Sequence, residues 1–403
     1  MSRVAVCHAK RLVGSPQDFG RASLDSVTEL VRKAVNASCD LKKLVAGKKV
    51  LIKPNLVRPI PNKLSTITDP RVIRAVALLA IEAGAKRVVV GEKPGYRLPA
   101  RQVFETAKIW ELLSDLDVEL CCFDEEECSE VEIPNARVFN KIRVPKVVLD
   151  SDVLIDLPKM KTHMHTLVSL GIKNLHGLTL DDQRLFYHRN DVNYKIVDIL
   201  RLKPPSLTVT DGIWPMEGQA PHYGETVKDF NVVVAGTDVV ATDAVTCSIM
   251  GIEPCEVDAI RIAHMEGLGC GDLSRIEIVG EKLENVRRHF KRGCISSAGV
   301  FPNVLCIEGG ACLGCLSAIR HSLDRLSHEG KLERLKKITI YTCKPMPETP
   351  PVTNYEGDLW LVGNCASELL FAQRDGKRRG NIIPGCAPYV SDLYDALCME
   401  YKL

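Results

Sequence analysis

Residues 49–91 read KVLIKPNLVRPIPNKLSTITDPRVIRAVALLAIEAGAKRVVVG. The apolar runs Lys49–Lys53 and Arg87–Gly91 predict two short buried strands. Between them, Asp69-Pro70 is typical of a helix start, with an N-cap followed by a first-turn proline, and apolar residues then recur at helical spacing. A strand, a helix and a strand in this order predict a β-α-β unit in a parallel sheet.

The same alternation continues along most of the chain. Helices are expected over Leu24–Ala37 and Gln102–Leu113. Further strands are expected at Val4–His8, Val118–Phe123, Val153–Leu157, Leu207–Asp211, Asn231–Ala235 and Arg275–Val279. A charged stretch over 281–302 suggests a boundary. We therefore predict an α/β protein, with a mostly parallel sheet in a large domain of residues 1–290 and a smaller α/β domain of residues 300–403.

Composition and charge exclude several classes of protein. The chain has 403 residues, 45% of them hydrophobic and 26% charged, as in ordinary globular proteins. A net charge of +2 gives no reason to expect a nucleic acid or a membrane as partner. No apolar run approaches the ~18 residues of a spanning helix, and the N-terminus enters a strand pattern without the layout of a signal peptide. A cytoplasmic location is expected, and the oligomeric state stays open.

Four cysteines near the C-terminus each follow a short apolar run. The runs and their cysteines are Val304–Ile307 with Cys312 and Cys315, Leu359–Val362 with Cys365, and Ile382-Ile383 with Cys386. Ligands collect at the carboxyl ends of strands in open α/β sheets, and converging thiolates with small neighbours suit an iron–sulfur cluster. A zinc site and unliganded thiols are the alternatives, although the spacing fits neither a compact zinc ribbon nor a ferredoxin-type run.

The chain contains sixteen cysteines, which is many for a cytoplasmic protein, where disulfides are disfavoured. This number suggests an anaerobic or metal-handling setting. Most of the others lie in apolar surroundings and are expected to be small core residues. A second metal site at Cys247, Cys255, Cys270 and Cys294 is a further alternative, with a spacing that matches no familiar pattern.

The layout strand, G-x-x-C-x-G-C, G-x-C-A and G-C-x-P resembles the small subunit of nickel–iron hydrogenases and the related subunit of complex I. The resemblance covers about the last hundred residues. It implies a flavodoxin-like domain that carries a [4Fe-4S] cluster on Cys312, Cys315, Cys365 and Cys386. Ala387 departs from the family, which usually has a proline there; this affects the stiffness of the loop and not ligation.

Polar residues gather at the ends of several expected strands in the large domain. Lys159, Lys161, His163 and His165 crowd what reads as a loop after Pro158, and Ser169, Lys173 and His176 would share one face of a helix. Other such residues are Lys53, Asn55, Asp69, Asn174 and Arg184. Lysines beside helix starts make a cationic pocket suited to carboxylate or phosphate, although a Lys/His run in a loop is often only a solvated face.

These residues lie in five motifs that occur in order and resemble the DUF362 family over about residues 1–265. The motifs are I-K-P-N-L, T-D-P with G-A-K-R-V-V-V-G-E, L-P-K-M-K-T-H with S-L-G-I-K-N-L-H-G-L, D-G-I-W-P-M-E-G, and G-T-D-V-V-A-T-D-A. The resemblance implies a redox setting, because members are often fused to iron–sulfur modules, but it implies no particular reaction. The layout is also distantly similar to lactate-racemase-type proteins, which use a nickel pincer cofactor.

Three functions fit this sequence. The first is an oxidoreductase that passes electrons from the cluster to an anionic small molecule or second cofactor. In it, Lys161, Lys173 and His163 would hold or protonate the substrate, with His163 as proton donor. Lys53, Asn55, Asp69, Ser169, Asn174 and Arg184 are the candidate substrate-binding residues.

The second function is an isomerase or racemase with a structural cluster, and the third is a non-enzymatic electron carrier or cofactor-assembly partner. The chain has no dinucleotide fingerprint of the G-x-G-x-x-G type in a strand–helix setting. A ferredoxin-like donor is therefore the expected source of electrons.

Overall fold

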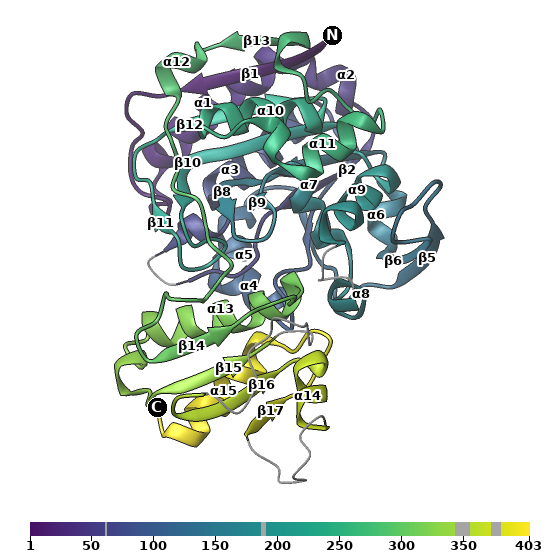
Figure 1. Cartoon of the computed structure of the whole chain (residues 1–403). Helices are drawn as coiled ribbons and strands as arrows, with labels where there is room; N and C mark the ends of the chain where they lie inside the picture. Colours follow the sequence, from purple (N-terminus) through teal and green to yellow (C-terminus); the bar gives the residue numbers. More distant parts are fainter. Residues whose placement is uncertain (61–62, 187–190, 343–354, 372–379) are drawn as a thin grey trace. The chain divides into compact units, whose positions relative to one another are not determined.

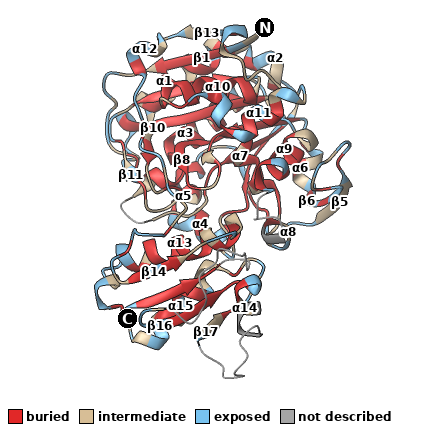
Figure 2. Ribbon diagram, in the orientation of Figure 1, coloured by how far each residue is buried: buried red, intermediate tan, exposed pale blue. Residues whose placement is uncertain are grey.

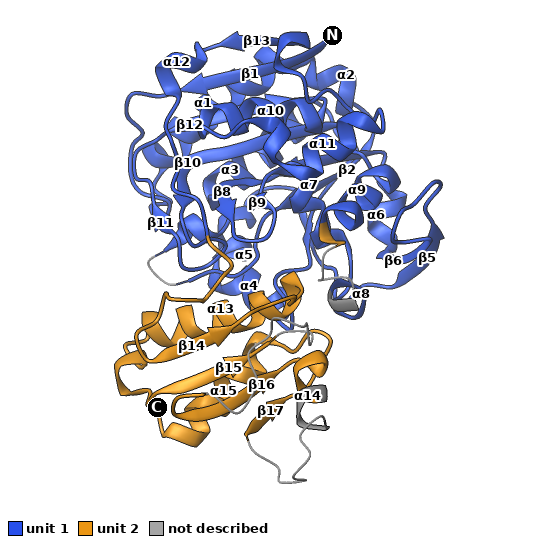
Figure 3. Cartoon of the chain, in the orientation of Figure 1, with its two compact units in different colours: residues 1–184, 193–293 blue, residues 185–192, 294–403 orange. Residues whose placement is uncertain are grey.

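The computed structural model describes residues 1–60, 63–186, 191–342, 355–371 and 380–403 (Figure 1). The chain divides into two compact units, which are treated separately below (Figure 3). Unit 1 comprises residues 1–184 and 193–293, and unit 2 comprises residues 185–192 and 294–403. In the described part of the chain, no helix combines the length and the apolar character needed to cross a membrane.

Unit 1 is built on one large sheet in the order β13-β1-β12-β10-β7-β2-β3-β4. The strands, in that order, are Ile276–Gly280, Ser2–His8, Val232–Gly236, Leu207–Glu217, Val153–Leu157, Lys49–Pro54, Arg87–Glu92 and Glu119–Cys122. Along this path only β12 runs antiparallel to its neighbours. The predicted α/β class and the mostly parallel sheet are confirmed.

Helices cover both faces of this sheet, so its central strands are buried on both sides (Figure 2). Val50 and Ile52 of β2 belong to a core shared with helices α1 (Arg21–Ser38) and α3 (Pro70–Glu82). Leu51 is equally buried but alternates to the opposite face. Burial on both faces explains why these strands read as continuous apolar runs.

The remaining helices and strands of unit 1 are shorter or lie at its periphery. They are α2 (Leu41–Val45), α6 (Lys146–Asp150), α7 (Gly171–Asn174), α8 (Asp181–Phe186), α9 (Val192–Leu202), α10 (Val239–Ile249), α11 (Asp258–Met265), α12 (Leu283–Val286), β5 (Cys128–Glu132), β6 (Lys141–Pro145), β9 (Leu167–Val168) and β11 (Glu225–Thr226). Strands β5 and β6 pair antiparallel as a separate hairpin.

Three local predictions were wrong. The helix expected over Gln102–Leu113 is two helices, α4 (Ala100–Thr106) and α5 (Ile109–Leu113), because Lys108 between them is left-handed with φ 55°. The loop expected after Pro158 is strand β8 (Lys159–His163), which extends the sheet beside β10. Ser169 precedes α7, so it does not share a helix face with Lys173.

Unit 2 contains a four-stranded parallel sheet in the order β14-β15-β16-β17. The strands are Val304–Ile307, Ile338–Tyr341, Asp358–Val362 and Asn381–Ile383, and the helices are α13 (Leu313–His328), α14 (Asn364–Phe371) and α15 (Val390–Tyr401). Ile340 and Trp360 pack with Leu323 of α13 and Leu397 of α15 to form the core. Because the strands are parallel, their carboxyl ends share one edge of the sheet.

Candidate functional site

A small cavity of about 80 Å³ lies in unit 1 at the carboxyl ends of β2 and β3 and beside β8 and α7. It brings together the predicted residues Lys53, Asn55, Lys161, His163, Ser169, Lys173, Asn174 and Arg184. Asp69 is the one predicted substrate-binding residue that does not line it. Residues from five segments far apart in the sequence therefore meet in one polar cavity.

Lys53, at the end of β2, forms a buried ion pair with Glu92, at the end of β3. The ammonium lies 2.9 and 3.0 Å from the two carboxylate oxygens, and both side chains are almost completely inaccessible to solvent. Leu56 N–H also donates to Glu92 at 3.2 Å. Burial raises the pKa of Glu92, while Lys53 opposes that shift. The positive charge of Lys53 is thus neutralised within the protein.

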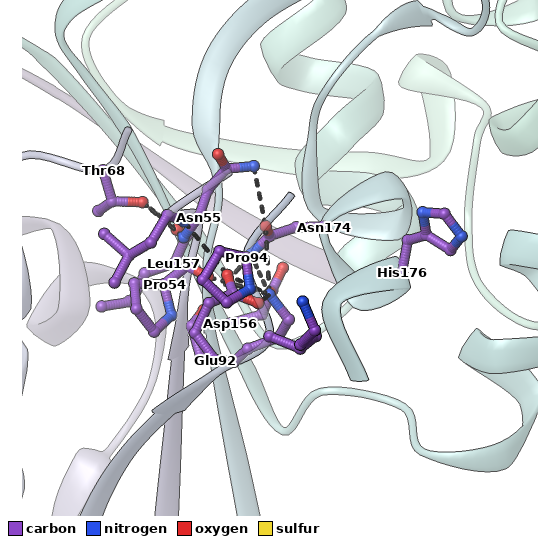
Figure 4. Close-up of polar contacts among 12 residues, drawn as sticks. Pro54, Asn55, Thr68, Glu92, Pro94, Asp156, Leu157, Asn174 and His176 are labelled. Atoms are coloured by element: carbon purple, nitrogen blue, oxygen red, sulfur yellow. Dashed lines mark hydrogen bonds and ion pairs between the residues drawn. The ribbon is translucent and has the colours of Figure 1, made fainter. Parts of the chain in front are cut away.

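Asn174 of α7 links the ends of β2 and β7. Its amide donates to Asp156 at 2.8 Å, and its carbonyl oxygen accepts from the Asn55 amide at 3.0 Å (Figure 4). The second carboxylate oxygen of Asp156 has no hydrogen-bond partner among the described residues. Burial raises the pKa of Asp156 well above its ordinary value, although Lys53 lies near enough to oppose the shift.

Lys161 reaches the cavity from β8. It donates to the Asn55 side-chain oxygen at 3.1 Å and to the Thr66 carbonyl at 2.8 Å, both of which are neutral acceptors. Burial lowers the pKa of Lys161 well below its ordinary value, and the nearby ammonium of Lys173 lowers it further. Lys159 on the same strand is different, because it pairs with Asp211 at 2.8 Å.

Lys173 and Arg184 complete the cationic wall. Burial lowers the pKa of Lys173 to about 8, and the positive charges of Arg184 and Lys53 act in the same direction. Arg184 donates to the carbonyls of Lys93, at 2.6 Å, and Pro94, so it too has neutral acceptors. An amine that titrates near pH 8 can hold an anion or exchange a proton with one.

His163 ends β8 and is largely buried against the cavity. Its Nδ1 accepts a hydrogen bond from the backbone N–H of His165 at 3.1 Å. When the ring is neutral, this bond puts the proton on Nε2. The neutral ring of His163 therefore presents Nε2–H as a hydrogen-bond donor.

Asp69 serves the fold of unit 1. Its carboxylate caps α3 and binds the Arg71 guanidinium at 2.7 Å in a fully buried pair. Its backbone N–H donates to the carboxylate of Asp211 at 2.7 Å. The start of α3, where sequence patterns suggested a bound anion, thus holds carboxylates of the protein itself.

The four predicted cluster ligands of unit 2 lie at the carboxyl edge of its sheet. Cys312 is the N-cap of α13, Cys315 lies in its first turn, and Cys365 lies in the first turn of α14. The hydrogen bond between Cys315 and Cys312, together with burial, raises the pKa of Cys315, and Cys365 is close enough to contribute. Cys386 follows Gly385, whose backbone N–H and carbonyl bond to Asn364 at 2.7 and 2.9 Å.

A glycine packs against one of these cysteines. A Cβ added to Gly363 would lie 2.7 Å from the sulfur of Cys315, so only glycine fits beside this thiol. In the described parts of the chain, no three His, Cys, Asp or Glu side chains are close enough to hold a single metal ion. A four-iron cluster binds its thiolates through different irons, so its ligands lie further apart than those of one ion.

Comparison with known proteins identifies the family. The "Domain of unknown function (DUF362)" matches residues 50–248. A thylakoid-associated protein of Synechocystis sp. is 31% identical over 228 residues, which cover 55% of this chain and 69% of that protein. The chain belongs to the DUF362 family. The resemblance of unit 2 to hydrogenase and complex I subunits stays a prediction.

Two solved structures are similar to the DUF362 protein. One is the lactate racemase apoprotein from Thermoanaerobacterium thermosaccharolyticum, with a TM-score of 0.37 and 16% identity over 52% of each chain. The other is a Thermotoga maritima protein from a structural genomics target, with a TM-score of 0.33 and 10% identity over 92% of this chain and 93% of that one.

Sequence reasoning missed several lining residues of this DUF362 protein, among them Glu92, Lys93 and Gly177, whereas His176 was expected near the pocket but was given no role. A signal for Glu92 was present, because it is a carboxylate that directly follows the buried strand beside the one that ends at Lys53. Gly177 has a structural role: a Cβ there would lie 2.2 Å from Glu92 and 2.5 Å from the Lys53 ammonium. His176 lies to one side of the Asn55–Asn174–Asp156 contacts (Figure 4).

Proposed function

We propose that this DUF362 protein is an iron–sulfur oxidoreductase that passes electrons from a [4Fe-4S] cluster in unit 2 to an anionic small molecule or second cofactor in the cavity of unit 1. Cys312, Cys315, Cys365 and Cys386 would hold the cluster. The proposal is carried by one observation: these thiols follow parallel strands of one sheet, with Gly363 packed directly against the Cys315 sulfur. A reducing, cytoplasmic setting and a ferredoxin-like electron donor are part of the proposal.

The residues of unit 1 have distinct parts in this reaction. Lys161 and Lys173 would attract the negative charge of the substrate, since no carboxylate bonds to either ammonium among the described residues. His163 would, as an imidazolium, deliver a proton to the substrate as it gains electrons and return to its neutral form. The cluster, when bound, would supply electrons one at a time. Asn55 and Asn174 would keep the Lys161 ammonium in position.

Two other functions each have an observation in their favour. A pKa of about 8 for Lys173 suits proton transfer near neutral pH, which favours an isomerase or racemase with a structural cluster. Exposure of Cys365 and Cys386 favours a non-enzymatic electron carrier or cofactor-assembly partner. The cavity beside Lys161 argues for chemistry on a small molecule and against that carrier role.

The test begins with anaerobic purification, iron and sulfide assays, and EPR of the reduced protein. We expect about four irons per chain, a rhombic EPR signal on reduction, and loss of both in Cys312→Ser. Cys398→Ser in α15 of the same unit is the matched control and should keep its iron. Iron that persists in Cys312→Ser, or a parent protein that binds only zinc, would overturn the proposal.

A second measurement separates the three functions. An oxidoreductase should oxidise a reduced ferredoxin-like donor faster when its anionic substrate is present, and Lys173→Met should reduce that effect. An isomerase would instead exchange substrate protons with solvent at a rate independent of any electron donor. A carrier would take up electrons at a rate that no small anion changes.

A further inference from the structure

The cavity of unit 1 carries more positive charge than its own carboxylates neutralise. Lys53 is paired with Glu92, and Lys93 is paired with Asp181 at 3.2 Å. Among the described residues, Lys161 and Arg184 bond only to neutral oxygens. In that part of the structure, neither side chain has a carboxylate partner.

Lys173 adds a third such cation. No acceptor bonds to its ammonium among the described residues, although the side chain lines the cavity. Behind the wall, the fully buried Lys195 donates to the Arg184 carbonyl at 2.6 Å, and no carboxylate in the described structure bonds to it. Like charges gathered away from water repel one another, and a bound anion removes that cost.

The size of the cavity limits what that anion can be. A volume of about 80 Å³ holds a few water molecules, whereas cavities for drug-sized ligands run from about 300 Å³ upward. Most of the lining residues are polar or charged, and Val57, Pro94 and Pro221 are the apolar ones with side chains. A nucleotide or a large aromatic cofactor is too big for this space.

We infer that the cavity binds a compact dianion, that is, two negative charges carried on a few heavy atoms, with Lys173 and Lys161 as its principal contacts. Inorganic phosphate and a two-carbon dicarboxylate share this chemistry. The inference rests on the proposed anionic substrate of this site and narrows it to one charge and one size. Two negative charges suit this site better than one, because in the described structure no carboxylate bonds to the amine of Lys161, the amine of Lys173 or the guanidinium of Arg184. Burial favours the neutral form of both amines, and a bound dianion would favour their protonation.

Isothermal titration of the full-length protein with four anions at constant ionic strength tests this inference. Oxalate or inorganic phosphate should bind at least about tenfold more tightly than acetate, and AMP should not bind in the cavity. Lys173→Met should weaken binding of the dianion about tenfold to a hundredfold. Lys86→Met, which removes an exposed lysine of unit 1, is the control and should leave the affinity unchanged. Whichever of oxalate and phosphate binds more tightly shows whether the natural ligand carries its charge on carboxylates or on a phosphate.

Acetate binding as tight as oxalate and phosphate binding would overturn the inference, as would an unchanged dianion affinity in Lys173→Met. If that variant fails to fold, Lys173→Arg keeps the charge and should bind the dianion within a few-fold of the parent, and the comparison of anions on the parent stands by itself. Iron is measured in the same samples. Dianion binding without iron refutes the redox function alone, whereas iron without dianion binding refutes this inference alone.

Discussion

Replacing Lys53 by methionine tests how unit 1 divides its charges between internal pairs and the ligand. The ammonium donates to both oxygens of Glu92 and to the Pro54 carbonyl at 3.0 Å. Methionine keeps an apolar stem that reaches the Cε position of lysine but removes the ammonium and its charge. Glu92 then stays buried, and the Leu56 N–H is its one remaining hydrogen bond among those described.

The burial of Glu92 determines how much the free energy of unfolding should fall. Breaking a buried ion pair by removing one partner costs about 3–5 kcal/mol, because the remaining charge is left uncompensated. For a urea m value of about 3 kcal/mol/M, the unfolding midpoint of unit 1 falls by about 1 M or more. The loss of stability in Lys53→Met relative to the parent should be smaller at pH 5 than at pH 7. Glu92 already has a raised pKa, and protonation at low pH removes the unpaired charge.

The assay can be restricted to unit 1. The chain has three tryptophans, of which Trp110 and Trp214 belong to unit 1 and Trp360 to the core of unit 2. In a Trp360→Phe background, tryptophan fluorescence during urea unfolding reports on unit 1. Lys141→Met is the control, because Lys141 pairs with Glu132 at 3.5 Å on an exposed surface, where such pairs contribute little.

The double variant Lys53→Met/Glu92→Gln provides the decisive comparison. It removes both charges and should recover most of the stability that Lys53→Met loses. If Lys53→Met unfolds within about 0.3 M urea of the parent, or if the double variant is no more stable than the single one, the buried pair does not neutralise Lys53 as described. Lys53 would then count among the cations available to a ligand.

Three further predictions concern other parts of the chain. Gly363→Ala, which puts a Cβ 2.7 Å from the Cys315 sulfur, should lower the iron content by more than half, whereas Gly330→Ala, also at positive φ but in open space, should not. Dianion affinity should fall as the pH rises through 8 and Lys173 loses its proton, and titrations between pH 6.5 and 9.5 that show no such fall would contradict its role. Asp198→Ala should destabilise unit 1 by about 3 kcal/mol or more in urea unfolding, because the carboxylate accepts three backbone N–H groups; a loss below about 1 kcal/mol would contradict that reading.

Strands buried on both faces were the predictable part of the fold. The runs that became β2, β3 and β7 are apolar at nearly every position, because each face packs against helices. Strand β8 was missed for the converse reason. Its lysines are fully buried, and a Lys-rich run ordinarily indicates a solvated loop. The tertiary partners of these lysines make burial possible: Asp211 for Lys159, and Asn55 with the Thr66 carbonyl for Lys161.

The sequence could predict which strand ends meet at the candidate site, but not which lysine forms an ion pair with which carboxylate. Parallel strands bring Lys53, Glu92 and Asp156 to one edge of the sheet, and that much follows from β-α-β alternation. Which cation meets which carboxylate depends on side-chain packing across the edge. The sequence therefore could not show that Lys53 is neutralised by Glu92 whereas Lys173 is left to the cavity.

The backbone N–H groups at two helix starts of unit 1 are already occupied, which favours recognition of the ligand by side chains. Asp243 accepts from the backbone N–H groups of Gly171 and Ile172 at 2.7 and 2.9 Å, and so occupies the start of α7 beside the cavity. Asp211 binds the N–H of Asp69 at the start of α3 in the same way. With both starts filled by internal carboxylates, an incoming anion meets side-chain ammonium groups and not a cradle of backbone N–H groups. Compact point charges select for charge more than for shape. Phosphate and oxalate should therefore differ less in affinity from each other than either differs from acetate.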